Sequence, residues 1–211
     1  PAYGLKIRIF NELQHTITGW PGGKPDADAT HRPERATPHP KRGVVFSPEP
    51  SDDVLGMGGT LRRLVEQGHA VTVVYLTSGN LAVPDEEAVM ATELVLELAP
   101  GAQENPGAVF AREARRQLEA KSAFEGDTPT IRRLKGLIRR GEARASLKVC
   151  GIDAAHVRFL DLPFYEQGRY RQFKIGAADT TAVTTLLREL KPHQVFTTGQ
   201  LDDPSAVAAV G

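Results

Sequence analysis

The sequence has little cysteine, few aromatic residues and no long apolar run. Its single cysteine, Cys150, has no second thiol for an internal disulfide or for a cysteine-based zinc site, so we expect a reducing, cytoplasmic location. No stretch reaches the roughly 20 apolar residues of a membrane span, and the N-terminus lacks a basic-then-apolar leader pattern. We therefore expect no membrane partner.

The chain also lacks an excess of either charge. Lysine plus arginine number 26 and aspartate plus glutamate number 26, so the formal net charge is zero. No overall field attracts a polyanion, and we expect no nucleic-acid partner. With 211 residues, of which 40% are apolar, the chain is long enough to bury one core.

The composition divides the chain into two parts. Residues 1–42 are rich in proline, glycine and charge, and they contain only one short predicted helix, near Leu5–Leu13. We interpret 1–42 as an extended linker or strap. Trp20 is expected to anchor it in an apolar groove, in preference to the alternative of stacking on a ligand. Residues 43–211 form the predicted α/β domain.

Short β-branched and aromatic runs alternate with helical patterns from residue 43 onward. The predicted strands are 43–47, 70–76, 157–160 and 194–198, and the predicted helices are 57–67, 86–98, 111–124, 130–149 and 179–190. This alternation predicts a Rossmann-like open, mostly parallel sheet with helices on both faces. Ligands bind such sheets beyond the carboxyl ends of the strands. The site is therefore expected in the loops 48–56, 77–83, 161–168 and 199–208.

The run GMGG at 56–59 matches a dinucleotide-binding fingerprint only in part. The third glycine position of GxGxxG falls on Leu61, and the second strand ends in TSGN without an acidic residue for a ribose. Close packing of a helix on a strand also explains these glycines. Nucleotide binding is thus a third hypothesis, weaker than the two that follow.

Several motifs together resemble the LmbE-like (PIG-L) deacetylases. VFSPEPSDDVLGMGGT at 45–60, GHAV at 68–71 and LTSG at 76–79 are similar to the opening of that family. The segments TGWPGGKPDADATHRPERA, IRRGEARA, FLDLPFYEQG and LKPHQVFTTGQLDDP are similar to the LmbE-type module that is fused behind a glucosamine-6-phosphate deaminase-like domain. The resemblance runs from about residue 15 to the C-terminus. It also implies further strands beyond Gly211, so we expect a C-terminally truncated domain.

The resemblance implies zinc-dependent deacetylation of an N-acetylglucosamine-type compound, with or without a phosphate group. This amide hydrolysis needs a zinc ion to polarise the carbonyl and acidify a water, a carboxylate base and an acid for the leaving amine. The implied partners are an amino-sugar or sugar-phosphate small molecule and a fused or neighbouring glucosamine-6-phosphate deaminase-like domain.

The chain departs from the family's metal and base residues at four positions. Glu49 occupies the position of a zinc-binding histidine, and Ser51 that of the base aspartate. Ser205 and Ala208 occupy the two histidine positions of a later loop, so that only Asp52 keeps the family's zinc-binding residue. Serine is not basic near neutral pH, and loss of such a base typically costs a factor of about 10²–10⁴ in rate. We therefore expect impaired hydrolysis.

Two hypotheses from different classes remain open. The domain is either a weak zinc-dependent deacetylase or a pseudoenzyme that binds an amino sugar or a partner domain without chemistry. Glu49 and Asp52 supply two of the three protein ligands that a catalytic zinc needs. Together with Asp202 or Asp203 they could instead form an all-oxygen site for calcium or magnesium.

A substrate-binding frame is also implied. The resemblance gives Arg139 a role in holding a sugar or phosphate, whereas the sequence spacing alone indicates a surface pair with Glu142. Asp161, Tyr165 and Glu166 follow the third predicted strand and are placed to hydrogen-bond sugar hydroxyls. Turn formation explains that loop nearly as well.

Overall fold

The computed structural model describes residues 2–6, 9, 40–99, 105–166 and 175–197. Its elements are, in chain order, β1 (Arg42–Ser47), α2 (Asp52–Glu66), β2 (Ala70–Tyr75), η2 (Asn80–Ala82), α3 (Asp85–Leu98), α4 (Pro106–Ala120), α5 (Pro129–Val149), η3 (Ala154–His156), β3 (Val157–Phe159), α6 (Pro163–Glu166), α7 (Ala177–Leu190) and β4 (Gln194–Phe196). Residues 2–6 and 9 are helical, in line with the short helix predicted near Leu5–Leu13. Trp20 lies outside the described residues.

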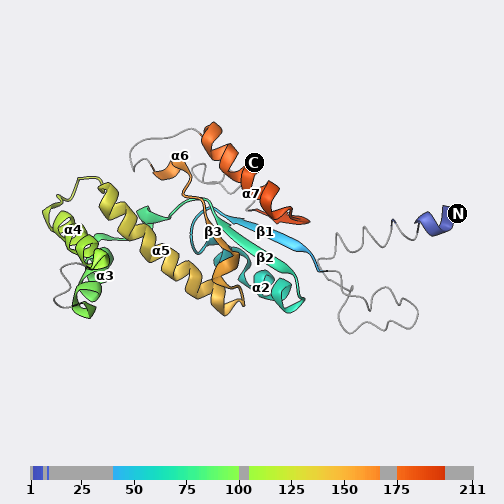
Figure 1. Ribbon diagram of the computed structural model, residues 1–211, viewed down its shortest axis with the longest axis horizontal. Coiled ribbons are helices and arrows are strands. Elements are labelled where there is room, and N and C mark those ends of the chain that lie inside the picture. The colour runs from blue at the N-terminus through green and yellow to red at the C-terminus, as the bar shows by residue number, and fades with distance from the viewer. Residues whose placement is uncertain (1, 7–8, 10–39, 100–104, 167–174, 198–211) are drawn as a thin grey trace.

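Four parallel strands form the sheet, in the order β3-β2-β1-β4. Val45 of β1 pairs with Val73 of β2 on one side and with Phe196 of β4 on the other. The chain therefore reverses its direction across the sheet beside β1, and ligands of open α/β sheets bind at such a reversal. The predicted Rossmann-like sheet is confirmed (Figure 1).

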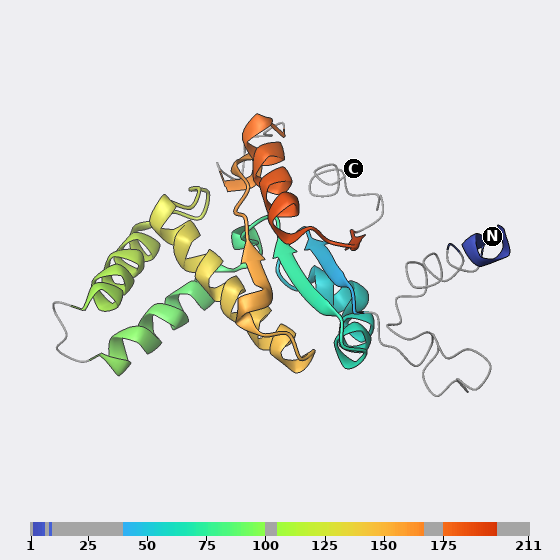
Figure 2. The same ribbon diagram turned by 45° about the vertical axis from the view of Figure 1, so that its right-hand side comes forward.

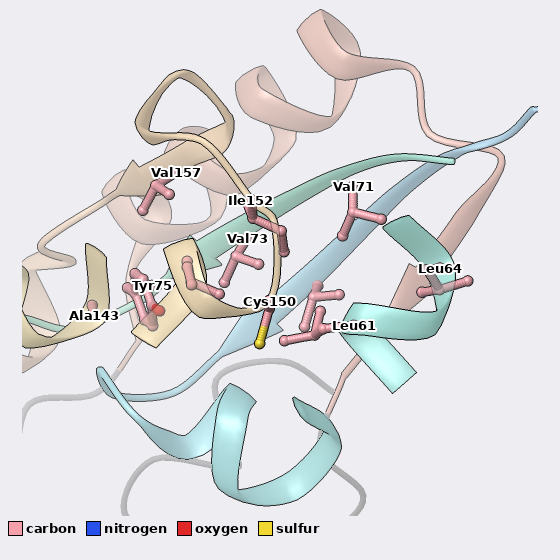
Figure 3. Close-up of a cluster of buried hydrophobic side chains, with 11 residues drawn as sticks. Leu61, Leu64, Val71, Val73, Tyr75, Ala143, Cys150, Ile152 and Val157 are labelled. Atoms are coloured by element: carbon pink, nitrogen blue, oxygen red, sulfur yellow. The ribbon is translucent and has the colours of Figure 1, made fainter. Parts of the chain in front are cut away.

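Helices cover both faces of this sheet. On one face Val73 packs with Leu61 of α2 and Leu147 of α5, in the cluster that Figure 3 draws. On the other face Val74 packs with Leu186 of α7. Figures 1 and 2 accordingly show α7 on the opposite side of the strands from α2 and α5. Because both faces are covered, the last five residues of β1 and of β2 are all buried, without the alternation of a half-exposed strand.

The helices α3 and α4 form a hairpin that stands away from the sheet and packs against the amino-terminal half of α5 (Figure 2). Its small core contains Ala88 and Leu118, which meet Ile131 of α5. The helices α4 and α5 start in the same way, with a side-chain cap followed by proline. The caps are Asn105, which accepts from the Gly107 amide, and Thr128, which accepts from the Ile131 amide.

Two helices, α2 and α4, begin about one turn or more before the predicted residue. The helix α4 starts at Pro106, where the Asn105 cap holds its first turn. The helix α2 starts at Asp52, because the Ser47 hydroxyl at the end of β1 accepts a hydrogen bond of 3.1 Å from the Asp53 amide. Its backbone leaves helical geometry at Met57, within the glycine-rich run that suggested a later start.

Two lysines and two aspartates form a salt-bridge network between the helical hairpin and α5. The Lys135 ammonium lies 2.5 Å from Asp85 and 2.9 Å from Asp127, and Lys121 contacts the same two carboxylates. The Lys135 side chain is only 5% exposed. Burial opposes ionisation of Asp85, but the two ammonium groups outweigh it and lower the pKa of this carboxyl group. The stabilisation is therefore present above the usual carboxyl pKa and is lost as the pH falls through the lowered value.

Replacing Asp127→Asn removes one of two carboxylates from both buried ammonium groups. We expect the free energy of unfolding at pH 7, measured by urea denaturation, to fall by about 1–3 kcal/mol. The control Asp153→Asn changes an exposed carboxylate without a side-chain cap role, and should stay within about 0.5 kcal/mol. A loss no larger than that of the Asp153 variant would contradict this account of the network.

Candidate functional site

The first loop of the candidate site joins β1 to α2 and is held by short-range hydrogen bonds. The Ser47 hydroxyl donates to the Glu49 carbonyl over 2.6 Å, and an Asp52 carboxylate oxygen accepts from the Glu49 amide over 3.1 Å. Ser51 adopts a left-handed backbone with φ of 92°, which costs a residue other than glycine about 1–2 kcal/mol. The loop is therefore held in one shape by its neighbours.

Directly beneath this loop lies a buried acid–phenol pair. Asp53 is 3% exposed and accepts a hydrogen bond of 3.0 Å from the Tyr75 hydroxyl. Burial raises the pKa of Asp53, against the opposing effect of that hydrogen bond. Burial and the charge of Asp53 raise the pKa of Tyr75. The sequence analysis did not predict this pair. Its only local signals were an acidic residue after Glu49 and Asp52 in the first loop motif, and an aromatic residue at the end of β2.

Polar contacts tie the loops after β1, β2 and β3 together. The Thr77 hydroxyl donates to the Pro48 carbonyl over 2.9 Å, which joins the first two loops. Glu166 accepts from the Ser78 amide over 3.1 Å and from the Asn80 side chain over 3.3 Å, which joins the third. Three of the four predicted loops thus meet at the carboxyl edge of the sheet.

Arg139 of α5 reaches across to the first loop. One of its terminal nitrogens donates to the Pro50 carbonyl, and the other lies 2.5 Å from Glu142. The predicted surface pair is therefore present, and so is a contact with the candidate site. Gly79 fits between the two partners: a Cβ added there would lie 2.9 Å from Pro50 and 3.3 Å from Arg139.

Tyr165 and Asp161 complete the third loop. Burial raises the pKa of the Tyr165 hydroxyl, and the charges of Glu49 and Glu166 raise it further, so this tyrosine remains a neutral phenol. Asp161 has a left-handed backbone with φ of 46° and accepts from Arg140. The charge of Glu49 in the first loop therefore acts on the Tyr165 hydroxyl. Asp161 instead contacts Arg140 of α5.

The described residues do not by themselves form a zinc site. Glu49 and Asp52 come from one short loop, and no group of three or more histidine, cysteine or acidic side chains in the described ranges could hold a metal ion. The described histidines, His69, His156 and His193, immediately precede β2, β3 and β4, at the opposite edge of the sheet. A catalytic zinc usually has three protein ligands, so Glu49 and Asp52 alone do not make a catalytic zinc site.

The fourth predicted loop follows β4, which ends at Phe196. Ser205 and Ala208 lie outside the described residues, as do Asp202 and Asp203. The roles that the sequence suggests for these four side chains, including the all-oxygen site for calcium or magnesium, remain predictions.

A comparison with protein families decides the relationship. The family model PIG-L, described as GlcNAc-PI de-N-acetylase, matches residues 44–207. The chain belongs to the PIG-L family. The resemblance inferred from the sequence motifs is thereby confirmed, and the fold is that of a deacetylase-type hydrolase.

A comparison with individual proteins found a relative of this chain. A protein of Bacteroides thetaiotaomicron, provisionally named glucosamine-6-phosphate deaminase-like protein, is 53% identical over 206 residues. The match covers 96% of this chain and 31% of the relative, so the chain spans about a third of that protein's length. No solved structure matches the chain. Among the described residues, no helix has the length and apolarity needed to cross a membrane.

The contact of Gly79 with Pro50 predicts that a side chain at this glycine separates two loops of the site. Gly79 and Gly68 both have positive φ, of 65° and 79°, but an added Cβ meets Pro50 at the first and nothing within 4 Å at the second. Gly68→Ala should therefore cost only the backbone strain of about 1–2 kcal/mol. Gly79→Ala should lower the free energy of unfolding by about 1–3 kcal/mol more. Equal losses in urea denaturation would show that the two loops are not tightly packed.

Proposed function

We propose that the carboxyl edge of this PIG-L domain binds an N-acetylglucosamine-type compound, phosphorylated or not, without efficient hydrolysis of its amide. The observation that carries this proposal is Ser51. The structure holds this serine at the start of α2, in the loop where the resemblance puts the family's carboxylate base. A hydroxyl group cannot accept a proton from water near neutral pH, so the base is missing from an otherwise ordered loop.

A pocket at the same edge of the sheet supports the binding part of the proposal. It has a volume of about 420 Å³ and opens between α5 and the loops after β2 and β3. This volume is within the usual range for small-molecule sites. Asp161 and Glu166 line it, and their carboxylate oxygens are suitable acceptors for sugar hydroxyls. Arg139 holds the first loop in place from the adjacent turn of α5.

The hydrolytic part depends on the residues that replaced the family's ligands. A bound zinc would polarise an amide carbonyl and acidify a water, but Glu49 and Asp52 alone leave its protein ligand set incomplete. Ser205 and Ala208 occupy the family's two remaining histidine positions, and the methyl group of alanine cannot bind a metal. The weak deacetylase is accordingly the second candidate function.

We also propose that the domain works beside a deaminase-like domain. This rests on the relative from Bacteroides thetaiotaomicron, whose provisional name refers to glucosamine-6-phosphate deaminase and of which this chain spans 31%. An amino sugar would be a shared ligand class for two such domains.

Release of free amine from N-acetylglucosamine tests the proposal. We expect the unsubstituted chain, dialysed against zinc, to hold less than one equivalent of the metal by elemental mass spectrometry and to release no amine above the buffer rate. Calorimetric titration with N-acetylglucosamine should nevertheless give saturable binding. Turnover that a chelator abolishes would overturn the proposal in favour of the weak deacetylase, and absent binding would overturn its first part.

A matched pair of variants separates the metal from the base. The combined substitutions Glu49→His, Ser205→His and Ala208→His restore the family's histidines and should raise zinc content to about one equivalent, with little turnover. Adding Ser51→Asp restores the base and should raise the rate by about 10²–10⁴. Equal rates for the two variants would contradict the role assigned to position 51.

A further inference from the structure

One glycine of α5, Gly136, lines the pocket between that helix and the loops after β2 and β3. Arg132, Gly136 and Arg140 are four residues apart and share one face of that helix. A Cβ added at Gly136 would lie 3.3 Å from the Cβ of Ser78, so the helix approaches the loop after β2 closely at this point. The missing side chain permits this close approach, and an arginine lies one turn away on either side of it.

The charges that line this pocket do not cancel. Three arginines and two carboxylates line the pocket, and both carboxylates have partners. Asp161 pairs with Arg140, and Glu166 accepts from the Ser78 amide and the Asn80 side chain. The lining therefore carries a net positive charge before any ligand enters.

Arg132 is the arginine left without a partner. The third lining arginine, Arg133, stacks over the ring of Phe110 at 5.1 Å. The Arg132 guanidinium makes no ion pair, hydrogen bond or ring contact with any residue in the described part of the chain. An unpaired guanidinium in a concave pocket is a ready anion ligand, because its planar fork matches the oxygens of a phosphate. Its place in the first turn of α5 adds the positive end of the helix dipole.

We propose that this pocket holds the phosphate group of a small phosphomonoester, with Arg132 as its main ligand. Arg140 contributes as well, since a guanidinium has five donors and Asp161 does not use them all. Asp161 and Glu166 then face the hydroxyl groups next to the phosphate, which favours a sugar phosphate over a bare polyanion. Only the identity of that sugar rests on the proposed function above.

Calorimetric titration with inorganic phosphate tests the anion site directly. The unsubstituted chain should bind one phosphate, more weakly as ionic strength rises. Arg132→Gln should weaken binding about tenfold or more, because a charge-assisted contact is lost. Arg132→Lys, which keeps the charge but not the fork, should lie between the two.

Arg116→Gln is the matched control, since Arg116 lies on α4 outside the pocket, 71% exposed and paired with Glu113. It should bind phosphate like the unsubstituted chain. No saturable binding by the unsubstituted chain, or equal losses in the Arg132→Gln and Arg116→Gln variants, would overturn the proposal. Circular dichroism of each variant confirms that the fold is retained.

A second titration separates the phosphate site from the proposed function. N-acetylglucosamine 6-phosphate should bind more tightly than N-acetylglucosamine, and Arg132→Gln should remove that advantage while leaving the affinity for the neutral sugar unchanged. Phosphate binding that depends on Arg132, without binding of either sugar, would refute the amino-sugar ligand and keep the anion site. An Arg132→Gln variant that loses both sugars equally would refute the phosphate site.

Discussion

Everything in this domain depends on the parallel pairing of β1 with a neighbour on each side. A strand that is paired along both edges and covered on both faces has no side chain or backbone group left for a ligand except at its ends. Its carboxyl end leads into the loop at 48–51 and α2, beside the reversal of the strand order. The ligand site is therefore confined to one edge of the sheet by the burial of the rest.

Three contacts that shape this edge come from residues other than Glu49 and Ser51. Thr77 donates to a backbone carbonyl at Pro48, Arg139 donates to another at Pro50, and Glu166 binds the loop after β2. These contacts need neither a metal ligand nor a carboxylate at position 51. The loop therefore keeps its shape with serine there.

Sequence reasoning succeeded where one segment carries its own signal. Strands such as 70–76 are short apolar runs, and the caps and prolines that open α5 are local. Sequence reasoning failed where a contact between segments that are distant in the sequence decides the structure. The early start of α2 needs the Ser47 hydroxyl from the preceding strand, and the Asp53–Tyr75 pair joins residues 22 apart. Nothing in the sequence distinguishes Arg132 from a surface charge. Its pocket forms only where α5 packs against the loops after β2 and β3.

The helix α5 belongs to two cores at once. Its carboxyl half packs on the sheet through Leu147, whereas its first turns pack on the helical hairpin through Ile131, and Arg133 stacks on Phe110 of α4. The hairpin core is small, so its amides should exchange with solvent through local openings that leave the sheet intact. Such an opening frees the turn that carries Arg132. By linkage, any ligand held by that turn must slow hydrogen exchange in a hairpin that it never touches.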